Sequence, residues 1–433
     1  MNRARIASLF ALTLLSTIPA GAGCQAADTL PAIPAAAQAG PGFDAAAATQ
    51  AWLDAVPPEA RAASDAYFEG GYWLQLWTVL LAAAVYIALL ATGMSAKMRD
   101  LAERVTRFRL VHVATYVVQF TLVTTVLSFP LTVYQFFFRE HQYGLATQTF
   151  GAWMGDQLKN LALGLVFGVV FMVVLYAVLR RAPRTWWIWG SAVSVGAFVF
   201  VALISPVFIA PLFNTYTTLD DPRVSGPILS MARANGIPAS EVYVMDASRQ
   251  TTRVSANVSG FLGTERITLN DNLLNRTTLP EIEAVMGHEM GHYVLNHVYK
   301  MMLFFGVLLV LVFAVLDRTS SWALRRWGAR WGVRGMDDPA GFPLLALAVT
   351  LIFFVLTPVT NTYIRVQEQE SDIFGLNAAR QPDGMAAVSL KLGEYRKLSP
   401  GPLEEMIFFD HPSGRTRIHT AMRWKAEHLG RVR

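Results

Sequence analysis

The segment His288-Glu289-Met290-Gly291-His292 combines the side chains needed for metal-assisted hydrolysis. On a helix, residues four positions apart lie on one face, so the two imidazoles can bind a single cation. Glu289 then lies beside the open coordination position, where it can take a proton from water whose pKa zinc lowers to about 7. The pattern alone is only moderately specific, because most pairs of histidines on a helix are surface or core residues.

The surroundings of this segment favour a functional role. A charged turn that contains Asn296, His297 and Lys300 leads directly into an apolar run. Ionisable residues at the edge of a bilayer are costly, and they are therefore candidates for function. On a continuous helix, His297 would lie within about a quarter-turn of the face that carries His288. It can support a metal ligand from there, or it can be an ordinary interfacial histidine.

A catalytic zinc ion needs a third protein ligand, and Glu368 is the candidate. Two apolar runs separate it from the histidines, so the chain returns to the membrane face that it left. Asp372 follows one helical turn later, where it can accept the second N–H of a ligating histidine and fix its tautomer. From spacing alone, Glu370 remains a rival to Glu368.

The elements that position these residues are mostly membrane spans. Of 433 residues, 53% are hydrophobic and 15% are charged, whereas charged residues make up about a quarter of a soluble domain. A bilayer core of about 30 Å needs about 20 helical residues to cross it. Six runs have nearly that length and almost no charge: 73–94, 110–138, 161–179, 186–208, 301–316 and 342–363. So many long runs disfavour a large soluble protein with buried helices.

We expect six regions along the chain. Residues 1–23 have the layout of a secretory signal peptide or an N-terminal anchor, and Cys24 is an alternative site of lipid attachment. Residues 24–72 are rich in alanine and proline and are interpreted as a flexible tether. The remaining regions are four transmembrane helices (73–209), a catalytic segment with the two histidines (210–299), a transmembrane hairpin (300–363) and a C-terminal catalytic segment with the third ligand (364–433).

The first catalytic segment has mixed α and β character. We expect an amphipathic helix over 222–235, a strand over 242–245 and an edge strand over 266–269. Thr278 and Glu281 form a capping box for the helix that carries the two histidines. Pro280 lies in the first turn of that helix, where its missing N–H costs nothing.

Loop charges predict the orientation in the membrane. Basic residues concentrate in three connections, 97–109, 180–184 and 318–334, whereas the connection 139–159 carries only Arg139 and Lys159. The positive-inside rule makes the three basic connections cytoplasmic. In a bacterial inner membrane the catalytic segments then face the periplasm. Since these loops explain most of the basic charge, we expect the lipid bilayer as a partner and no nucleic acid.

At these residues the sequence resembles the CAAX prenyl protease 1 family of integral-membrane zinc metalloendopeptidases. The resemblance extends from about residue 120 to 424 and is most specific in segments 287–297 and 365–372 and at His411-Pro412 and Arg417-Ile418. It implies a mainly α, polytopic helical membrane protein whose zincin-like metalloprotease domain is split by a transmembrane hairpin. It also implies one Zn²⁺ per chain, with Glu368 as the third ligand.

The resemblance further implies two sets of residues around the metal. His411 and Arg417 match positions that stabilise the oxyanion of the tetrahedral intermediate, a role suited to donors aimed at developing charge. An edge strand within 255–260 would hold an extended substrate through Ser255, Ala256 and Asn257. Here Ser255 stands where the family has asparagine, and Asn257 stands where an aromatic is usual. The implied substrate is a peptide or membrane protein, which can be lipidated.

Alternatives to a selective protease remain open from the sequence. A general quality-control metalloprotease would use the same chemistry on less selected substrates. A metal transporter would place ionisable groups near the middle of its spans, whereas here they cluster at the ends. An inactive scaffold would not need an intact base together with three intact ligands.

Overall fold

The computed structural model describes residues 32–259 and 266–428. The expected signal peptide or anchor, Cys24 and Gly260 lie outside the described residues. Among these residues, six helices are long and apolar enough to cross a membrane, as predicted. They are α3 (Pro58–Ala91), α5 (Arg109–Val133) continued by η2 (Tyr134–Phe138) and α6 (Arg139–Gln142), α7 (Phe150–Arg181), α8 (Trp186–Ile204) continued by η3 (Ser205–Ile209) and η4 (Ala210–Leu212), α12 (His297–Trp331), and α13 (Phe342–Ala379).

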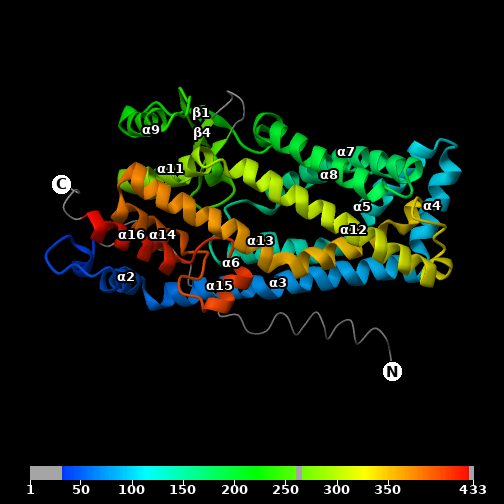
Figure 1. Ribbon diagram of the computed structural model, residues 1–433, viewed down its shortest axis with the longest axis horizontal. Helices are drawn as coiled ribbons and strands as arrows, with labels where there is room; N and C mark the ends of the chain where they lie inside the picture. Colours follow the sequence, from blue (N-terminus) through cyan, green and yellow to red (C-terminus); the bar gives the residue numbers. More distant parts are fainter. Residues whose placement is uncertain (1–31, 260–265, 429–433) are drawn as a thin grey trace.

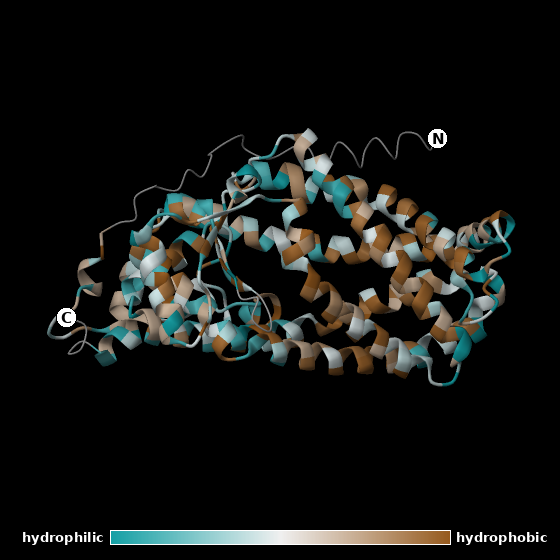
Figure 2. Ribbon diagram, turned by 90° about the horizontal axis from the view of Figure 1, so that it is seen from above, coloured by the Kyte–Doolittle hydropathy of each residue, from teal (hydrophilic) through white to brown (hydrophobic). Residues whose placement is uncertain are grey.

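These helices present apolar side chains outward as well as inward. Val126, Leu303 and Val355 are at least 70% exposed, although each lies within a long apolar helix. In water such exposure would be unfavourable, whereas in lipid it costs nothing. Between the helices, Tyr116 and Tyr176 are fully buried in one core cluster. Figure 2 shows this hydrophobic part of the molecule beside a more hydrophilic end.

The hydrophilic end contains a small sheet. Its strands are β1 (Tyr216–Thr218), β2 (Val242–Met245), β4 (Arg266–Asn270) and β3 (Ala256–Ser259), in that spatial order. β2 and β4 are parallel, and the two outer pairs are antiparallel. The prediction of an edge strand over 266–269 is wrong, because β4 lies inside the sheet with Ile267 and Leu269 fully buried. β1 and β3 are the edge strands of this sheet.

Helices complete this end of the molecule (Figure 1). Those of the first catalytic segment are α9 (Pro222–Ala234), η5 (Ala247–Arg249), α10 (Asp271–Arg276) and α11 (Leu279–Val294). The C-terminal segment adds α14 (Pro382–Leu392), α15 (Pro402–Phe408) and α16 (Gly414–His428). The expected strand over 242–245 and the expected helix near 222–235 are both confirmed.

The expected tether over 24–72 is wrong for most of its length. Residues 35–37 form η1 (Ala35–Ala37), residues 45–54 form α2 (Ala45–Asp54), and α3 begins at Pro58 rather than at residue 73. Asp44 caps α2 by accepting the N–H of Ala46 at 2.7 Å. Trp52 and Leu53 are buried in a cluster with residues of α13, α14 and α16. Alanine favours helix, and two large apolar side chains are enough to dock a short one.

The opposite end of the bundle carries α4 (Met94–Val105) and η6 (Pro339–Gly341) (Figure 1). Arg99 of α4 pairs with Asp338 beside η6 at 2.5 Å, and both side chains are buried. Arg334 pairs with Glu103 at 2.6 Å. Two of the three basic connections therefore meet at the end of the molecule that lies away from the sheet.

Candidate metal centre

The helix α11 begins as its sequence predicts. The carboxylate of Glu281 accepts the N–H of Thr278 at 2.7 Å, which closes the predicted capping box, and Pro280 lies in the first turn. Lys391 of α14 lies 3.2 Å from the same buried carboxylate. The start of α11 is therefore fixed both locally and by a neighbouring helix.

Glycine allows α11 and α13 to touch through their backbones. A Cβ atom on Gly375 would lie 2.7 Å from the backbone nitrogen of His288, and one on Gly287 would lie 2.9 Å from the carbonyl oxygen of Gly375. Real Cβ atoms do not approach so closely, so a larger residue would separate the helices. This contact brings the α13 carboxylates to the histidines of α11.

His288, His292 and Glu368 converge on one point. The two Nε2 atoms are 3.2 Å apart, and they lie 3.2 and 3.4 Å from the nearest carboxylate oxygens of Glu368. Donors about 2.1 Å from one tetrahedral ion would be about 3.4 Å apart. The Oε2 atom of Glu368 is buried and accepts no hydrogen bond. The donor set, its spacing and this unpaired oxygen therefore fit a divalent metal ion.

The far nitrogen of His288 is held from behind by a buried ion pair. Its Nδ1 lies 2.8 Å from Oδ1 of Asp372. The Nε of Arg417 donates to the same carboxylate at 2.9 Å. The side chain of Asp372 is 2% exposed and that of Arg417 is 8% exposed. The buried charges are thus paired, and His288 is fixed with its Nε2 toward Glu368.

His292 has a different set of partners. Its Nδ1 lies 2.9 Å from Nδ1 of His297, whose Nε2 lies 3.0 Å from Glu370. Lys300 donates to the same carboxylate at 3.0 Å. The expectation that His297 continues the helix of His288 is wrong, because Asn296 has φ 58° and separates α11 from α12. Asparagine tolerates this left-handed conformation better than most residues, and the break turns His297 back toward His292.

Burial and charge alter the pKa values of two groups on α11. Burial opposes the charged form of His288, but the adjacent carboxylates of Asp372 and Glu368 outweigh it and raise its pKa to about 9. Burial raises the pKa of Glu289, opposed by the neighbouring histidines. A carboxylate with a raised pKa is a stronger proton acceptor than one in water.

His411 approaches the site from the loop before α16. Its Nε2 lies 3.1 Å from Oε2 of Glu368, and its Nδ1 lies 2.7 Å from Asp410. Burial lowers the pKa of His411, against the hydrogen bond to Asp410. His411 therefore lies on the metal side of the site, whereas the guanidinium of Arg417 faces Asp372 behind it.

A cavity of about 300 Å³ opens in front of these residues. Ser255 and Ala256 line it together with His288, Glu289 and His411, among other residues. Asn257 does not line it and is exposed on β3, opposite Thr268 of β4. The edge of β3 therefore begins at the mouth of the site.

Two family models match the chain. The model of peptidase family M48 matches residues 218–425, and the model of the CAAX prenyl protease N-terminal domain, described as five membrane helices, matches residues 46–215. The boundary between the two matches falls at the start of the sheet.

The chain is a membrane metalloprotease with an M48 peptidase domain.

Three relatives match this metalloprotease over most of their own length. An uncharacterized metalloprotease, YhfN, of Bacillus subtilis is 29% identical over 78% of this chain and 79% of its own. CAAX prenyl protease 1 of Saccharomyces cerevisiae is 27% identical over 70% of each chain. The crystal structure of S. mikatae Ste24p has a TM-score of 0.74 and 20% identity, covering 84% of this chain and 90% of that one. The last comparison shows a common fold.

Among the residues that line the cavity of the metalloprotease, sequence reasoning missed the polar side chains of Arg253, Tyr395 and Arg396. They come from the segment before β3 and from the segment between α14 and α15. No motif or spacing marks them, since only the packing of distant segments brings them to the site.

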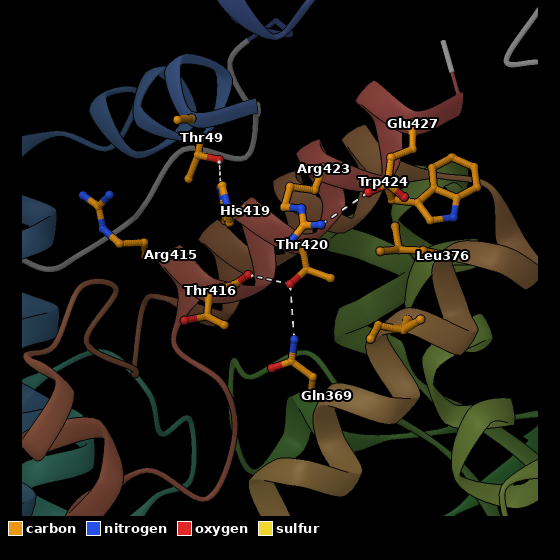
Figure 3. A pocket seen from close by; sticks show the side chains of 12 residues that line it. Thr49, Gln369, Leu376, Arg415, Thr416, His419, Thr420, Arg423, Trp424 and Glu427 are labelled. Atoms are coloured by element: carbon orange, nitrogen blue, oxygen red, sulfur yellow. Dashed lines mark hydrogen bonds and ion pairs between the residues drawn. The ribbon is translucent and has the colours of Figure 1, made fainter. Parts of the chain in front are cut away.

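The metalloprotease has a second, larger hollow of about 670 Å³ between α2, α13 and α16 (Figure 3). Thr49 of α2 contacts His419 of α16 at 3.3 Å, and Gln369 contacts Thr420 at 3.5 Å. None of His288, His292 and Glu368 lines this hollow. It lies along the docked α2 and outside the candidate metal centre.

Proposed function

We propose that this metalloprotease is a zinc endopeptidase that cleaves extended segments of peptides or membrane proteins at the periplasmic face of a bacterial inner membrane. The observation that carries the proposal is the convergence of His288, His292 and Glu368 next to Glu289, a buried carboxyl group whose pKa is raised. Two neutral imidazoles and one carboxylate form a common ligand set of catalytic zinc sites. The remaining coordination position would face the cavity.

The three ligands would hold the ion, which would act as a Lewis acid on the scissile carbonyl and on a water molecule. Glu289 would take the proton of the attacking water and later deliver it to the leaving amine. Its burial beside the ligands supports this role, because a carboxylate with a raised pKa accepts a proton more readily.

We assign different roles to His411 and Arg417, although the family resemblance implies the same role for both. Protonated His411 would donate its Nδ1–H to Asp410 and its Nε2–H to the oxygen that becomes negative in the transition state, since Nε2 faces the metal side of the site. Arg417 has its Nε bound to Asp372, so its contacts support the positioning of His288.

The substrate would extend the sheet at the free edge of β3. An edge strand offers unpaired N–H and C=O groups to an extended peptide. Ser255 and Ala256 line the cavity and would contact the residues next to the scissile bond. Asn257 would contact a residue farther from the metal. CAAX prenyl protease 1 of yeast is named for a prenylated substrate motif, and we infer that lipid attachment to the substrate is compatible with this fold.

The periplasmic placement rests on the basic connections. The ion pairs of α4 with the α12–α13 connection lie at the end away from the candidate metal centre. The positive-inside rule would place this end in the cytoplasm.

The test measures zinc content together with cleavage of an unmodified peptide and of the same peptide carrying a farnesyl group. Wild type is compared with Glu289→Gln and with the matched control Glu283→Gln, whose carboxylate contacts Gln381 at 2.7 Å on another face of α11. We expect one zinc in all three proteins and loss of cleavage of at least about a thousandfold in Glu289→Gln alone.

Unchanged cleavage by Glu289→Gln would remove this residue as the base. Equal cleavage of the two peptides would mean that prenylation is not required, and cleavage of the farnesylated peptide alone would mean that it is. Zinc absent from wild type as purified and on reconstitution would contradict the ligand assignment.

A further inference from the structure

The candidate active-site cavity is lined by three arginines that differ in their partners. Arg417 is paired with Asp372, and Arg253 is paired with Glu140 at 2.6 Å. Among the residues that the structure describes, Arg396 forms no such ion pair, although nearby basic residues such as Lys397 do. Its guanidinium lies 5.8 Å from the ring centroid of Tyr395.

Arg396 lies where two hollows share a wall. It lines the cavity that contains His288, Glu289 and His411, and also an adjacent cavity of about 430 Å³. Arg253 and Tyr395 line both hollows as well, and the ring of Tyr395 lies 5.2 Å from the guanidinium of Arg253. Two guanidinium groups therefore lie near one ring in the shared wall, where they contribute positive charge.

The segment that carries Arg396 is held in place. The backbone carbonyl of Arg396 accepts a hydrogen bond from the hydroxyl of Ser64 on α3 at 3.1 Å, and the same hydroxyl donates to the carbonyl of Gly393. Asp410 lines the second hollow, but its Oδ1 is engaged by His411 at 2.7 Å. Arg396 is thus a half-buried, positioned cation, and the acidic side chain that shares the second hollow with it already contacts His411.

We propose that Arg396 binds a carboxylate of the peptide substrate, either the C-terminal carboxylate or an Asp or Glu side chain near the scissile bond. The inference rests on the proposed peptidase function and adds a specificity-determining residue to it. The planar guanidinium binds a carboxylate through two parallel hydrogen bonds. A neutral substrate leaves the half-buried cation without a partner, which weakens its binding by the cost of that unpaired group.

The experiment compares matched peptides with the zinc-loaded, full-length protein in detergent. One pair differs only in a free or amidated C-terminus, and further pairs exchange Glu for Gln at single positions near the cleaved bond. For wild type we expect kcat/KM to be at least about tenfold higher for the acidic member of one pair, mostly through KM. That pair identifies the source of the carboxylate.

In Arg396→Gln we expect this preference to fall below about twofold while cleavage of the neutral peptide persists. Arg396→Lys should retain part of the preference, and Arg396→Glu should reverse it toward a Lys-containing peptide. The control Arg423→Gln alters an exposed arginine of α16 that pairs with Glu427, and it should retain the wild-type preference. Zinc content and gel-filtration behaviour identify any variant that fails to fold.

Two results would overturn the proposal. One is a wild-type protein that cleaves peptides without preference for any acidic member. The other is an Arg396→Gln variant that keeps the wild-type preference, or loses neutral and acidic substrates equally while retaining zinc. A zinc-loaded wild type that cleaves no peptide would instead contradict the proposed peptidase function.

Discussion

The two histidines of the candidate metal centre lie one helical turn apart, yet the groups behind them differ in burial and charge. Behind His288 are Asp372 and Arg417, with side chains 2% and 8% exposed. Behind His292 is buried His297, which leads to Glu370, a carboxylate 45% exposed. One histidine is supported from inside the protein, and the other is connected to the surface.

The two sets of supporting groups should therefore contribute unequally to the geometry of the site. An ion pair shielded from water is strongly coupled, and removing one partner leaves an uncompensated buried charge. An exposed pair is screened by water and salt, and its contribution is small. We therefore expect the geometry of the site to depend mainly on Asp372 and only weakly on Glu370.

The largest effect should follow Asp372→Asn. The substitution leaves Arg417 buried beside a neutral amide and removes the carboxylate that holds Nδ1 of His288. We expect a loss of about 3–5 kcal/mol in stability and loss of stoichiometric zinc. Thermal unfolding in detergent and metal analysis measure both effects. A variant with wild-type zinc content and melting temperature would show that the buried pair is dispensable.

The pH dependence of metal binding should reveal the same buried support. The carboxylates of Asp372 and Glu368 raise the pKa of His288 to about 9. Below that pH the metal-free protein must therefore release a proton to bind a cation. Since the folded pKa is raised, apparent zinc affinity should increase by about tenfold per pH unit between pH 6.5 and 9 and then level off. Titration against a zinc chelator at fixed ionic strength measures this, and a constant affinity above pH 7 would contradict it.

A smaller effect is expected for His297→Ala, which removes the group in contact with Nδ1 of His292. Loss of a partner behind a ligand commonly weakens metal binding by about 10–100-fold. We expect a loss in this range with the fold retained, measured by chelator competition and by thermal unfolding. The matched comparison is His419→Ala, which alters an exposed histidine of α16 and should leave zinc affinity unchanged. A loss as large as that of Asp372→Asn would remove the distinction between the two supports.

The smallest effect should follow Glu370→Gln. This carboxylate contacts His297 and Lys300 with nearly half of its side chain exposed. We expect zinc affinity to change by at most about 1 kcal/mol, or about fivefold, and the change to shrink at high salt. Chelator competition at low and high ionic strength tests both points. A large effect that persists in high salt would mean that the surface pair is coupled to the metal site as strongly as the buried one.

The membrane spans and the helix of the candidate metal centre could be predicted from the amino-acid sequence alone. Long apolar runs are unambiguous because a bilayer demands about 20 helical residues at a time. The two histidines of α11 share a face because helical spacing is local, and its capping box depends on Thr278 and Glu281 alone. The even number of spans between α11 and Glu368 also predicted that they would meet.

The groups that contact the candidate ligands could not be predicted in this way, because they depend on how distant segments pack together. The left-handed Asn296 turns His297 toward His292, and Gly375 lets α13 approach α11. The docking of α2, the interior position of β4 and the unpaired Arg396 depend on contacts between segments far apart in the chain. Composition and periodicity report what each segment can form, whereas the partner of a side chain is set by which distant segment packs against it.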